Sequence, residues 1–285
     1  MPSASPEQTP TPWLVALDID GTLLDFGSPI SPVVLEAVRE VAAAGHRVIL
    51  ASGRSLVSMA LVARQLGVAA PYMVCSNGAV LVHAAALEPG GPTPAAHLGG
   101  HDDWVVSEAI TFDPGPALRQ LAAHLPNATF AVEDVGVGFR MTGPFPPGEL
   151  EGVHTVVPLE ELWGHEVTRV VVRAVDLAND DFVASIRDLG LADVTYAVGW
   201  SSWMDVAPLG VTKALGLEKV RGRLGIPAER TLAVGDGYND LEMIRWAARG
   251  VAMGNAEPEV KEAADEIAPS VHDDGLAAVL RTLPL

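Results

Sequence analysis

The chain is poor in cysteine, in basic residues and in long apolar runs, and each shortage excludes something. Only one cysteine, Cys75, occurs in 285 residues, so no disulfide can form within the chain, which is compatible with a reducing cytosol. No stretch approaches the ~20 apolar residues that a membrane-spanning helix needs. Basic residues number 18 against 36 acidic ones, and the formal net charge of −18 repels a nucleic-acid backbone. We therefore expect neither a membrane nor a nucleic-acid partner.

The first twelve residues contain no lysine or arginine. A signal peptide would begin basic and continue apolar, whereas residues 1–12 are rich in proline, serine and threonine. We interpret them as a disordered tail and expect a cytoplasmic protein. The overall acidity does not exclude a small phosphorylated metabolite as the partner, because a local cation reverses the field inside one cleft.

Strands and helices alternate at both ends of the chain. An apolar run over 13–17 predicts a buried parallel strand, and Ser31-Pro32 predicts the start of a helix. The same alternation predicts strands over 47–51, 72–75, 231–234 and 250–253, and helices over 56–66, 212–224, 241–248, 258–264 and 275–283. Such repeated βα units predict a Rossmann-like, doubly wound parallel sheet.

The middle of the chain has a different pattern. Asn77-Gly78 is a turn signal before a returning strand at 79–82, and residues 88–100 are rich in glycine and proline, which indicates a linker. Beyond it we expect strands at 128–132, 139–142, 167–175 and 194–198 and helices at 116–125 and 180–189. We therefore predict an α/β core, residues 13–83 and 200–285, with an inserted α+β cap domain, residues 84–199.

Two carboxylates follow the first predicted strand. Asp18 and Asp20 are two residues apart, so an extended chain directs both side chains to one side, into the crevice where open α/β sheets bind ligands. Gly21 permits a sharp turn, and Thr22 adds a hydroxyl. These residue types also occur in ordinary solvated turns, but two acids beside a wholly apolar strand require a reason. The functional interpretation makes Asp18 a nucleophile and Asp20 a general acid and base.

A third carboxylate, Asp236, follows the strand predicted over 231–234. Together with Asp18 and the backbone carbonyl of Asp20, it offers the oxygen ligands that Mg²⁺ prefers. Asn239 and Asp240 open the next helix, where both types are also favoured as helix caps. We expect Asn239 to contribute to substrate binding and Asp240 to support the metal ligands from behind.

Lys213 is one of only three lysines, and it stands in the first turn of a predicted helix. The helix dipole does not favour a cation there, so pairing with Asp18 and a phosphate oxygen would explain the placement. An exposed surface lysine is the simpler alternative. Ser52 ends the second strand, and its hydroxyl, with the N–H groups of Gly53 and Arg54, suits phosphate binding, although a plain helix cap has the same composition. Asn77 is foremost a turn residue, with a ligand role as the second interpretation.

In this order, the segments Asp18–Thr22, Ala51–Arg54, Lys213 and Gly235–Asp240 resemble the haloacid dehalogenase superfamily, and within it the Cof-type sugar phosphatases. The resemblance implies Asp18 as nucleophile, Asp20 as acid and base, Ser52 and Lys213 at the phosphate, and Asp236 at Mg²⁺. Ser52 stands where the family more often has threonine, and Leu209 and Ala214 replace residues that are often lysine and glycine. The chemistry should survive these departures, whereas a specific substrate assignment is weakened.

We therefore predict a Mg²⁺-dependent phosphatase that hydrolyses a small phosphomonoester, a sugar phosphate by resemblance, through an aspartyl-phosphate. Two alternatives remain open at this point. A phosphomutase of the phosphomannomutase type uses similar motifs and carries an inserted cap. A non-catalytic regulator that binds a phosphorylated sugar would share the binding residues without turnover.

Overall fold

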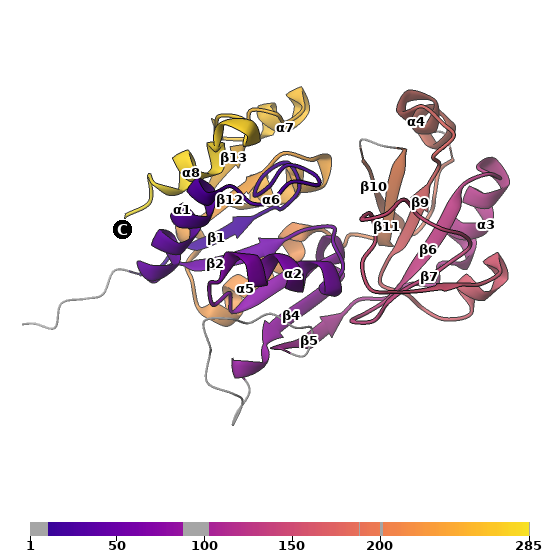
Figure 1. Ribbon diagram of the computed structural model, residues 1–285, viewed down its shortest axis with the longest axis horizontal. Helices are drawn as coiled ribbons and strands as arrows, with labels where there is room; N and C mark the ends of the chain where they lie inside the picture. Colours follow the sequence, from indigo (N-terminus) through magenta and orange to yellow (C-terminus); the bar gives the residue numbers. More distant parts are fainter. Residues whose placement is uncertain (1–10, 88–102, 188, 200–201, 285) are drawn as a thin grey trace, which may run out of the picture.

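The computed structural model describes residues 11–87, 103–187, 189–199 and 202–284, and these form two β-sheets side by side (Figure 1). The expected linker over 88–100 and most of the expected tail over 1–12 lie outside the described residues. The first sheet has eight strands in the order β14-β13-β12-β1-β2-β3-β4-β5, and the second has six in the order β10-β11-β9-β6-β7-β8.

The first sheet and its helices form the core. Its strands are β1 (Leu14–Leu17), β2 (Arg47–Ala51), β3 (Tyr72–Cys75), β4 (Val80–Ala84), β5 (Trp104–Ala109), β12 (Thr231–Gly235), β13 (Arg249–Ala252) and β14 (Glu266–Ile267). Its helices are α1 (Pro32–Ala43), α2 (Leu56–Leu66), α5 (Lys213–Leu224), α6 (Leu241–Trp246), α7 (Pro258–Ala263) and α8 (Gly275–Leu280). Strand β4 pairs antiparallel with both β3 and β5, and the other pairings of this sheet are parallel.

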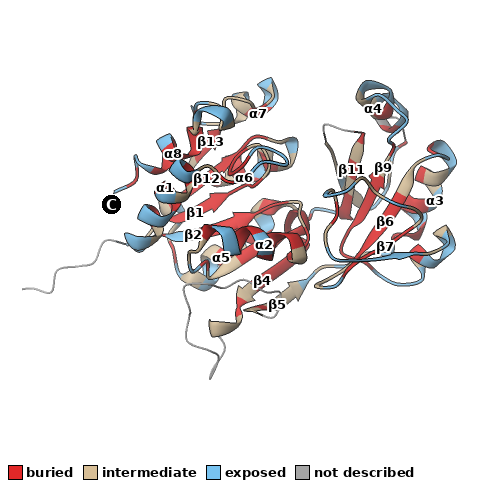
Figure 2. Ribbon diagram, in the orientation of Figure 1, coloured by how far each residue is buried: buried red, intermediate tan, exposed pale blue. Residues whose placement is uncertain are grey.

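Alternation along β1 explains why both faces of the core sheet are covered. Val15 and Leu17 belong to one apolar cluster with α1, α2 and α8, whereas Leu14 and Ala16 belong to another with α5 and α6. All four side chains are fully buried, as Figure 2 shows for the central strands. A strand that is apolar on both faces forms in a doubly wound sheet, and the predicted fold class is therefore confirmed.

The second sheet forms the cap. Its strands are β6 (Thr129–Asp134), β7 (Gly138–Met141), β8 (Val153–Val156), β9 (Val170–Arg173), β10 (Val194–Val198) and β11 (Trp203–Pro208). Helices α3 (Gly115–His124) and α4 (Asn179–Arg187) pack on one face, through side chains such as Leu118 and Phe182. The opposite face carries Glu133 of β6 and Trp203 and Asp205 of β11, which alternate along their strands with members of this apolar cluster, and Arg169, which directly precedes β9.

The sheets do not divide where the sequence boundaries were drawn. Strand β5 falls within the predicted cap, residues 84–199, yet it pairs with β4 in the core sheet. Strand β11 falls within the predicted core segment, residues 200–285, yet it pairs with β9 and β10 in the cap sheet. Both strands are the connections between the two units, and composition gave no sign of their pairing. The domain boundaries remain a prediction, and sheet membership favours moving them past β5 and β11.

Most predicted elements have a counterpart within a few residues, including the Ser31 cap, whose hydroxyl accepts a hydrogen bond from the N–H of Val33. Strand β8 was missed, since it lies at the edge of the cap sheet and is exposed throughout. Within the described ranges, no helix combines the length and the apolar character that crossing a bilayer requires.

One glycine allows the turn after β3 to touch the start of α5. Gly78 has a φ of +100°, and a Cβ atom added to it would stand 2.1 Å from the carbonyl oxygen of Thr212. We expect Gly78→Ala to lower the free energy of unfolding by at least ~2 kcal/mol, because both the left-handed backbone and the contact are lost. Denaturant titration measures the change.

The matched control is Gly222→Ala in α5, the helix whose start Gly78 contacts. An added Cβ meets nothing within 4 Å there, so alanine should raise the stability by about 0.5–1 kcal/mol through its helix propensity. A Gly78→Ala protein that unfolds at the wild-type denaturant concentration would refute the close approach.

Candidate active site

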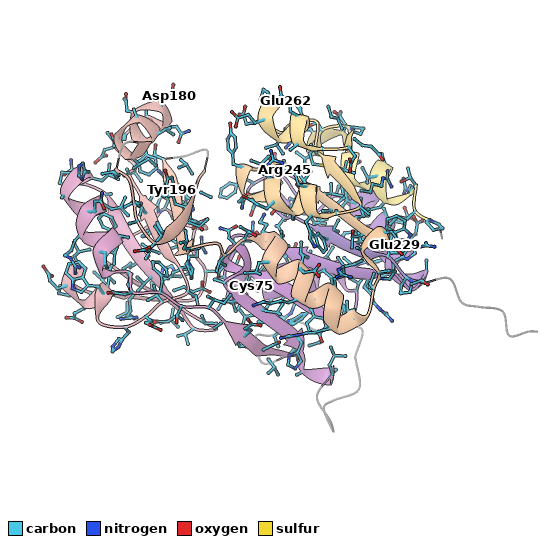
Figure 3. All side chains as sticks on the ribbon, turned by 180° about the vertical axis from the view of Figure 1, so that it is seen from behind. Cys75, Asp180, Tyr196, Glu229, Arg245 and Glu262 are labelled. Carbon is cyan, nitrogen blue, oxygen red and sulfur yellow. The ribbon has the colours of Figure 1, made fainter. Side chains whose placement is uncertain are left out.

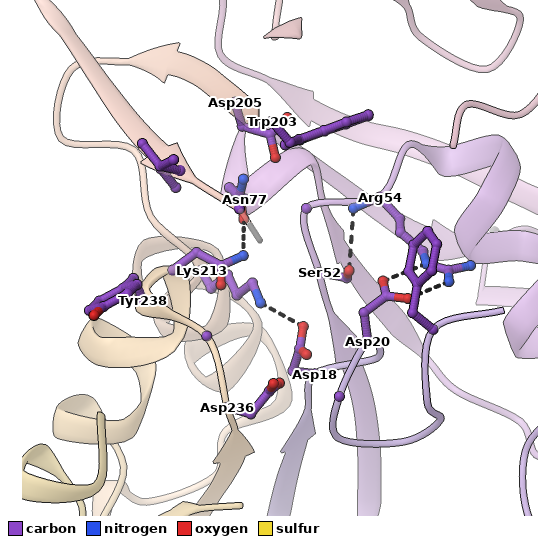
Figure 4. Close-up of a pocket in the computed structure, with 18 of the residues that line it drawn as sticks. Asp18, Asp20, Ser52, Arg54, Asn77, Trp203, Asp205, Lys213, Asp236 and Tyr238 are labelled. Atoms are coloured by element: carbon purple, nitrogen blue, oxygen red, sulfur yellow. Dashed lines mark hydrogen bonds and ion pairs between the residues drawn. The ribbon is translucent and has the colours of Figure 1, made fainter. Parts of the chain in front are cut away.

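The motif residues meet in one cavity between the core and the cap. Asp18 follows β1 and Asp236 follows β12, two parallel neighbours whose carboxyl ends lie at the point where the strand order reverses. The cavity has a volume of about 1110 Å³ and is lined by the core loops and by the open face of the cap sheet. Figure 4 shows the close-up, with Asp18 and Asp20 on the core side and Trp203 and Asp205 opposite.

Lys213 lies at the centre of the site and is completely buried. Its Nζ donates a hydrogen bond of 2.6 Å to Oδ1 of Asp18 and a second, shorter one to Oδ1 of Asp240. The N-cap Thr212, whose hydroxyl accepts from the N–H of Leu215, fixes the start of α5 and thereby the root of this side chain. The surface alternative for Lys213 is wrong, since the ammonium is enclosed by carboxylates.

The charges of this cluster do not cancel. Three buried carboxylates, Asp18, Asp236 and Asp240, can bring ligand atoms within 4.8 Å of one another, and Lys213 is the one ammonium among them. Burial and the neighbouring Asp240 raise the pKa of Asp18 well above its usual value, against the opposing effect of Lys213. Burial and Asp240 likewise raise the pKa of Asp236 to about 7. For Lys213 burial acts to lower the pKa, but Asp18 and Asp240 outweigh it and raise it.

The three carboxylates differ in their hydrogen bonds. Asp240 is saturated: Oδ1 faces Lys213, and Oδ2 accepts from the backbone N–H groups of Asp236 at 3.0 Å and of Gly237 at 2.9 Å. Asp236 accepts single bonds from Thr22 at 3.1 Å and from Asn255 at 3.2 Å. Asp18 and Asp236 therefore retain lone pairs for a cation, while Asp240 orients the loop and Lys213 from behind. This oxygen-only, electron-rich set suits a hard divalent ion.

Asp20 lines the same cavity but turns away from Lys213 (Figure 4). Its carboxylate accepts two hydrogen bonds from Arg54, 2.8 Å to Nε and 2.6 Å to Nη2. Ser52 is buried, and its hydroxyl accepts from the N–H of Arg54 at 3.3 Å. The predicted Ser52-Gly53-Arg54 segment therefore borders the cavity opposite Lys213.

The two asparagines predicted as ligands contact each other. The amide of Asn239 donates to Oδ1 of Asn77 at 2.9 Å, and both residues line the cavity. Asn77 and its neighbour Ser76 have φ values of +53° and +49°, so two successive residues of this turn are in the left-handed region. Such strain persists where the surroundings fix it, and here Gly78 and α5 provide that support.

Several residues of the site had no signal in the sequence. Asn255 follows β13, and its amide donates hydrogen bonds to Asp236 at 3.2 Å and to the carbonyl of Gly21 at 2.9 Å. It stands in no motif that the sequence makes recognisable. The cap contributes Asp205 of β11 and Arg169, which directly precedes β9, to the cavity lining, and Glu133 of β6 lies on the same face of the sheet. Only the period-two alternation with buried neighbours, such as Met204 and Val206 around Asp205, indicates that they share one face. Cys75 is buried, and burial raises its thiol pKa, which agrees with its interpretation as a small core residue.

Comparison with known proteins identifies the family. A family model of the haloacid dehalogenase-like hydrolases matches residues 15–88 and 149–280. The chain belongs to this family. It is 30% identical to the 5-amino-6-(5-phospho-D-ribitylamino)uracil phosphatase YitU of Bacillus subtilis, over 95% of this chain and 97% of that one. It is 28% identical to the pyridoxal phosphate phosphatase YbhA of Escherichia coli, over 94% and 97% of the two chains.

Among solved structures, a haloacid dehalogenase-like hydrolase from B. subtilis superimposes with a TM-score of 0.75 at 21% identity, covering 95% of this chain and 99% of the other. A subclass IIB sugar phosphatase of the superfamily gives 0.73 at 22% identity, covering 95% and 98%. These similarities place the chain in the Cof-type branch of the haloacid dehalogenase superfamily and make it a phosphoric monoester hydrolase.

The raised pKa of Asp236 makes the stability of this haloacid dehalogenase-like hydrolase depend on pH. The folded state holds a proton that the unfolded state, with an ordinary value of 3.8, releases at lower pH. This contribution to stability is therefore lost as the pH rises from about 4 to 7. In a chelator, Asp236→Asn should match the wild type near pH 4 and exceed its free energy of unfolding by roughly 2–4 kcal/mol at pH 8.

Denaturant titration across this pH range measures the difference, with Mg²⁺ as the second variable. Added Mg²⁺ should stabilise the wild type more than Asp236→Asn at pH 8, because binding to the folded state raises stability by mass action. A variant that is less stable than the wild type at pH 8 in chelator would contradict the charge excess.

Proposed function

We propose that this enzyme is a Mg²⁺-dependent phosphatase that hydrolyses a small phosphomonoester through an aspartyl-phosphate on Asp18. The observation that most supports this proposal is the position of Asp18. It is buried at the end of β1, faces the cavity and belongs to one charge cluster with Lys213 and Asp236. A carboxylate held on an ammonium in this way is oriented for in-line attack on phosphorus.

Two residues carry the covalent steps of the proposed mechanism. An oxygen of Asp18 attacks phosphorus, the bond from phosphorus to the ester oxygen breaks, and Asp20 gives its proton to the departing alcohol. Asp20 then takes a proton from water, the water oxygen attacks the phosphorus, and the bond to Asp18 breaks to release phosphate. Asp20 must leave its pairing with Arg54 to hold that proton. An incoming phosphate group competes for the same guanidinium, so substrate binding would free Asp20.

Asp18, Asp236 and the backbone carbonyl of Asp20 would hold Mg²⁺. The excess of buried negative charge at Asp18, Asp236 and Asp240 over Lys213 supports a divalent ion there. When bound, the ion supplies positive charge that keeps Asp18 ionised and offsets charge on the phosphoryl oxygens. Lys213, the Ser52 hydroxyl and the N–H of Gly53 would bind the remaining phosphoryl oxygens, and preorganised donors of this kind provide most of the acceleration in phosphoryl transfer.

The expected substrate is a small phosphorylated metabolite, with a sugar or sugar-alcohol phosphate as the working class. The names of the relatives support this size and type, since one acts on a phosphorylated ribityl compound, one on pyridoxal phosphate and one is a sugar phosphatase. The cap would cover the alcohol part of the ester and exclude water during the reaction.

The phosphomutase alternative requires a second anion site, because its intermediate carries two phosphate groups. Within the described residues, the cap contributes one cation to the cavity lining, Arg169, and that guanidinium is already paired with Asp205. A second phosphate would therefore meet carboxylates on the cap. This argues for hydrolysis over phosphoryl migration, and a product assay that finds free phosphate and no isomerised ester would agree.

We expect Asp18→Asn to abolish phosphate release from an aryl phosphate in the presence of Mg²⁺, by at least ~10³-fold in kcat, because the nucleophile is lost. Wild-type activity should disappear in chelator and return with Mg²⁺. Asp176→Asn, an exposed aspartate of the cap outside the cavity lining, is the matched control and should keep full activity. If Asp18→Asn kept its fold by circular dichroism and still turned over substrate substantially, the assignment of Asp18 as the nucleophile would be refuted.

A further inference from the structure

Aromatic side chains gather at the cavity. Within the described ranges, three aromatic residues are exposed, namely Phe26 at 67%, Tyr196 at 41% and Tyr238 at 45%, and all three line this one cavity. They come from different parts of the chain: the loop after β1, strand β10 and the loop after β12. Figure 3 shows Tyr196 on the cap strand next to the core. Exposed rings around one hollow favour a flat ligand that can stack on them.

A buried ion pair lies in the cap wall of the same cavity. Arg169 has a side chain that is 5% exposed. Its Nε donates a hydrogen bond of 2.7 Å to Oδ1 of Asp205, and its Nη2 lies 2.7 Å from the same oxygen in an ion pair. The guanidinium carbon also lies within about 6 Å of the ring centres of Phe139 and Trp203. Arg169 is thereby fixed on several sides, and it fixes Asp205 in turn.

The second carboxylate oxygen of Asp205, Oδ2, is not used by the pairing with Arg169. Oδ2 accepts no hydrogen bond from the described residues, and Asp205 lines the cavity. This oxygen reaches the phosphate-binding segment, since a Cβ atom added to Gly53 would lie 3.3 Å from it. A ligand donor that meets Oδ2 therefore stands within a few bonds of the phosphate ester. Oriented acceptors of this kind discriminate strongly, because a ligand without the donor leaves a desolvated carboxylate unpaired.

Carboxylates outnumber basic side chains in the lining of this cavity. The cavity lining outside the reaction centre includes six carboxylates, Asp25, Glu149, Glu151, Asp205, Glu242 and Glu257. Two of these carboxylates are paired with arginines, Asp205 with Arg169 and Glu149 with Arg173, while Asp25 lies 3.7 Å from Nδ1 of His272. An anionic group on the alcohol part of the substrate would meet this field without an unpaired cation, whereas an amine would be attracted.

We propose that Asp205, fixed by Arg169, is the specificity residue for the leaving group. It selects phosphate esters whose alcohol carries a planar ring with an N–H or ammonium donor near the ester, and the acidic lining rejects alcohols with a second anionic group. This inference rests on the proposed phosphatase function and narrows its substrate class from small phosphomonoesters to uncharged or cationic ring-bearing ones.

Three benzyl phosphates that differ at one ring position test the inference. The 3-aminomethyl, 3-methyl and 3-carboxy compounds keep the ester and the ring and change only the charge and the donor. For the wild type with Mg²⁺ we expect kcat/KM to fall in that order, by about 100-fold in total. Equal values for the three compounds, or a preference for the carboxylate, would overturn the inference while leaving the phosphatase proposal intact. If the enzyme releases phosphate from an aryl phosphate but from none of the three benzyl phosphates, this inference is overturned alone, whereas release from neither kind of ester overturns the phosphatase proposal as well.

Asp205→Asn then assigns the preference to one residue. Asparagine keeps an oxygen for Arg169 and removes the negative charge. The variant should lose at least tenfold in kcat/KM on the 3-aminomethyl compound, chiefly through KM, and stay within about twofold of the wild type on the 3-methyl compound. Asp176→Asn is the matched control. An unchanged ratio between the two compounds in a folded Asp205→Asn protein would refute the role of Asp205, and the wild-type ranking decides the substrate class even if the variant fails to fold.

Discussion

The structure depends on one buried ammonium group. Lys213 is the single cation among three carboxylates that the fold withdraws from water at the ends of β1 and β12. Removing one partner of a buried charge cluster typically costs several kcal/mol, so α5, the turn at Gly78 and the loop around Asp240 must hold their positions together. Burial and the remaining negative charge raise the pKa of Asp18 and Asp236, and the same charge supports the divalent ion that we propose. The like charges of Asp18, Asp236 and Asp240 repel one another and lower the stability of the fold around Lys213.

The parts of this site that the sequence predicted are those set by local rules. Asp18 and Asp236 each follow a wholly apolar strand, and the carboxyl ends of parallel strands meet at one edge of a sheet. Lys213 was conspicuous because lysine is rare in this chain. Its contact with Asp240 could not be predicted, since nothing in the helix signal at 212–224 specifies how α5 lies against the loop after β12.

The parts that the sequence did not predict depend on register and on distant pairing. Strand β11 was not predicted; it ends at Pro208 and contains Asp205, two residue types that are disfavoured in strands. It forms because β9 and β10 pair with it on both sides. Asn255 and Arg169 gain their roles only when segments far apart in the chain are brought together. Local patterns thus predicted the carboxylates and the lysine that meet on the core side of the cavity, while the cap side of the cavity came from the tertiary structure.

One buried acid, Glu133, connects the cap side of the cavity with the core loops around Lys213. Glu133 stands on the open face of the cap sheet, and its Oε2 accepts a hydrogen bond of 2.5 Å from the hydroxyl of Ser76 in the core. Burial raises the pKa of Glu133, against the lowering effect of Arg169, so the acid belongs both to this contact and to the surroundings of Asp205. Ser76 precedes Asn77, which bonds Asn239 in the loop that carries Asp236 and Asp240. A shift of the cap at Glu133 must therefore either break a buried hydrogen bond or move the strained turn that contacts Asn239, and the cost of both keeps the cap side of the cavity in register with the core side.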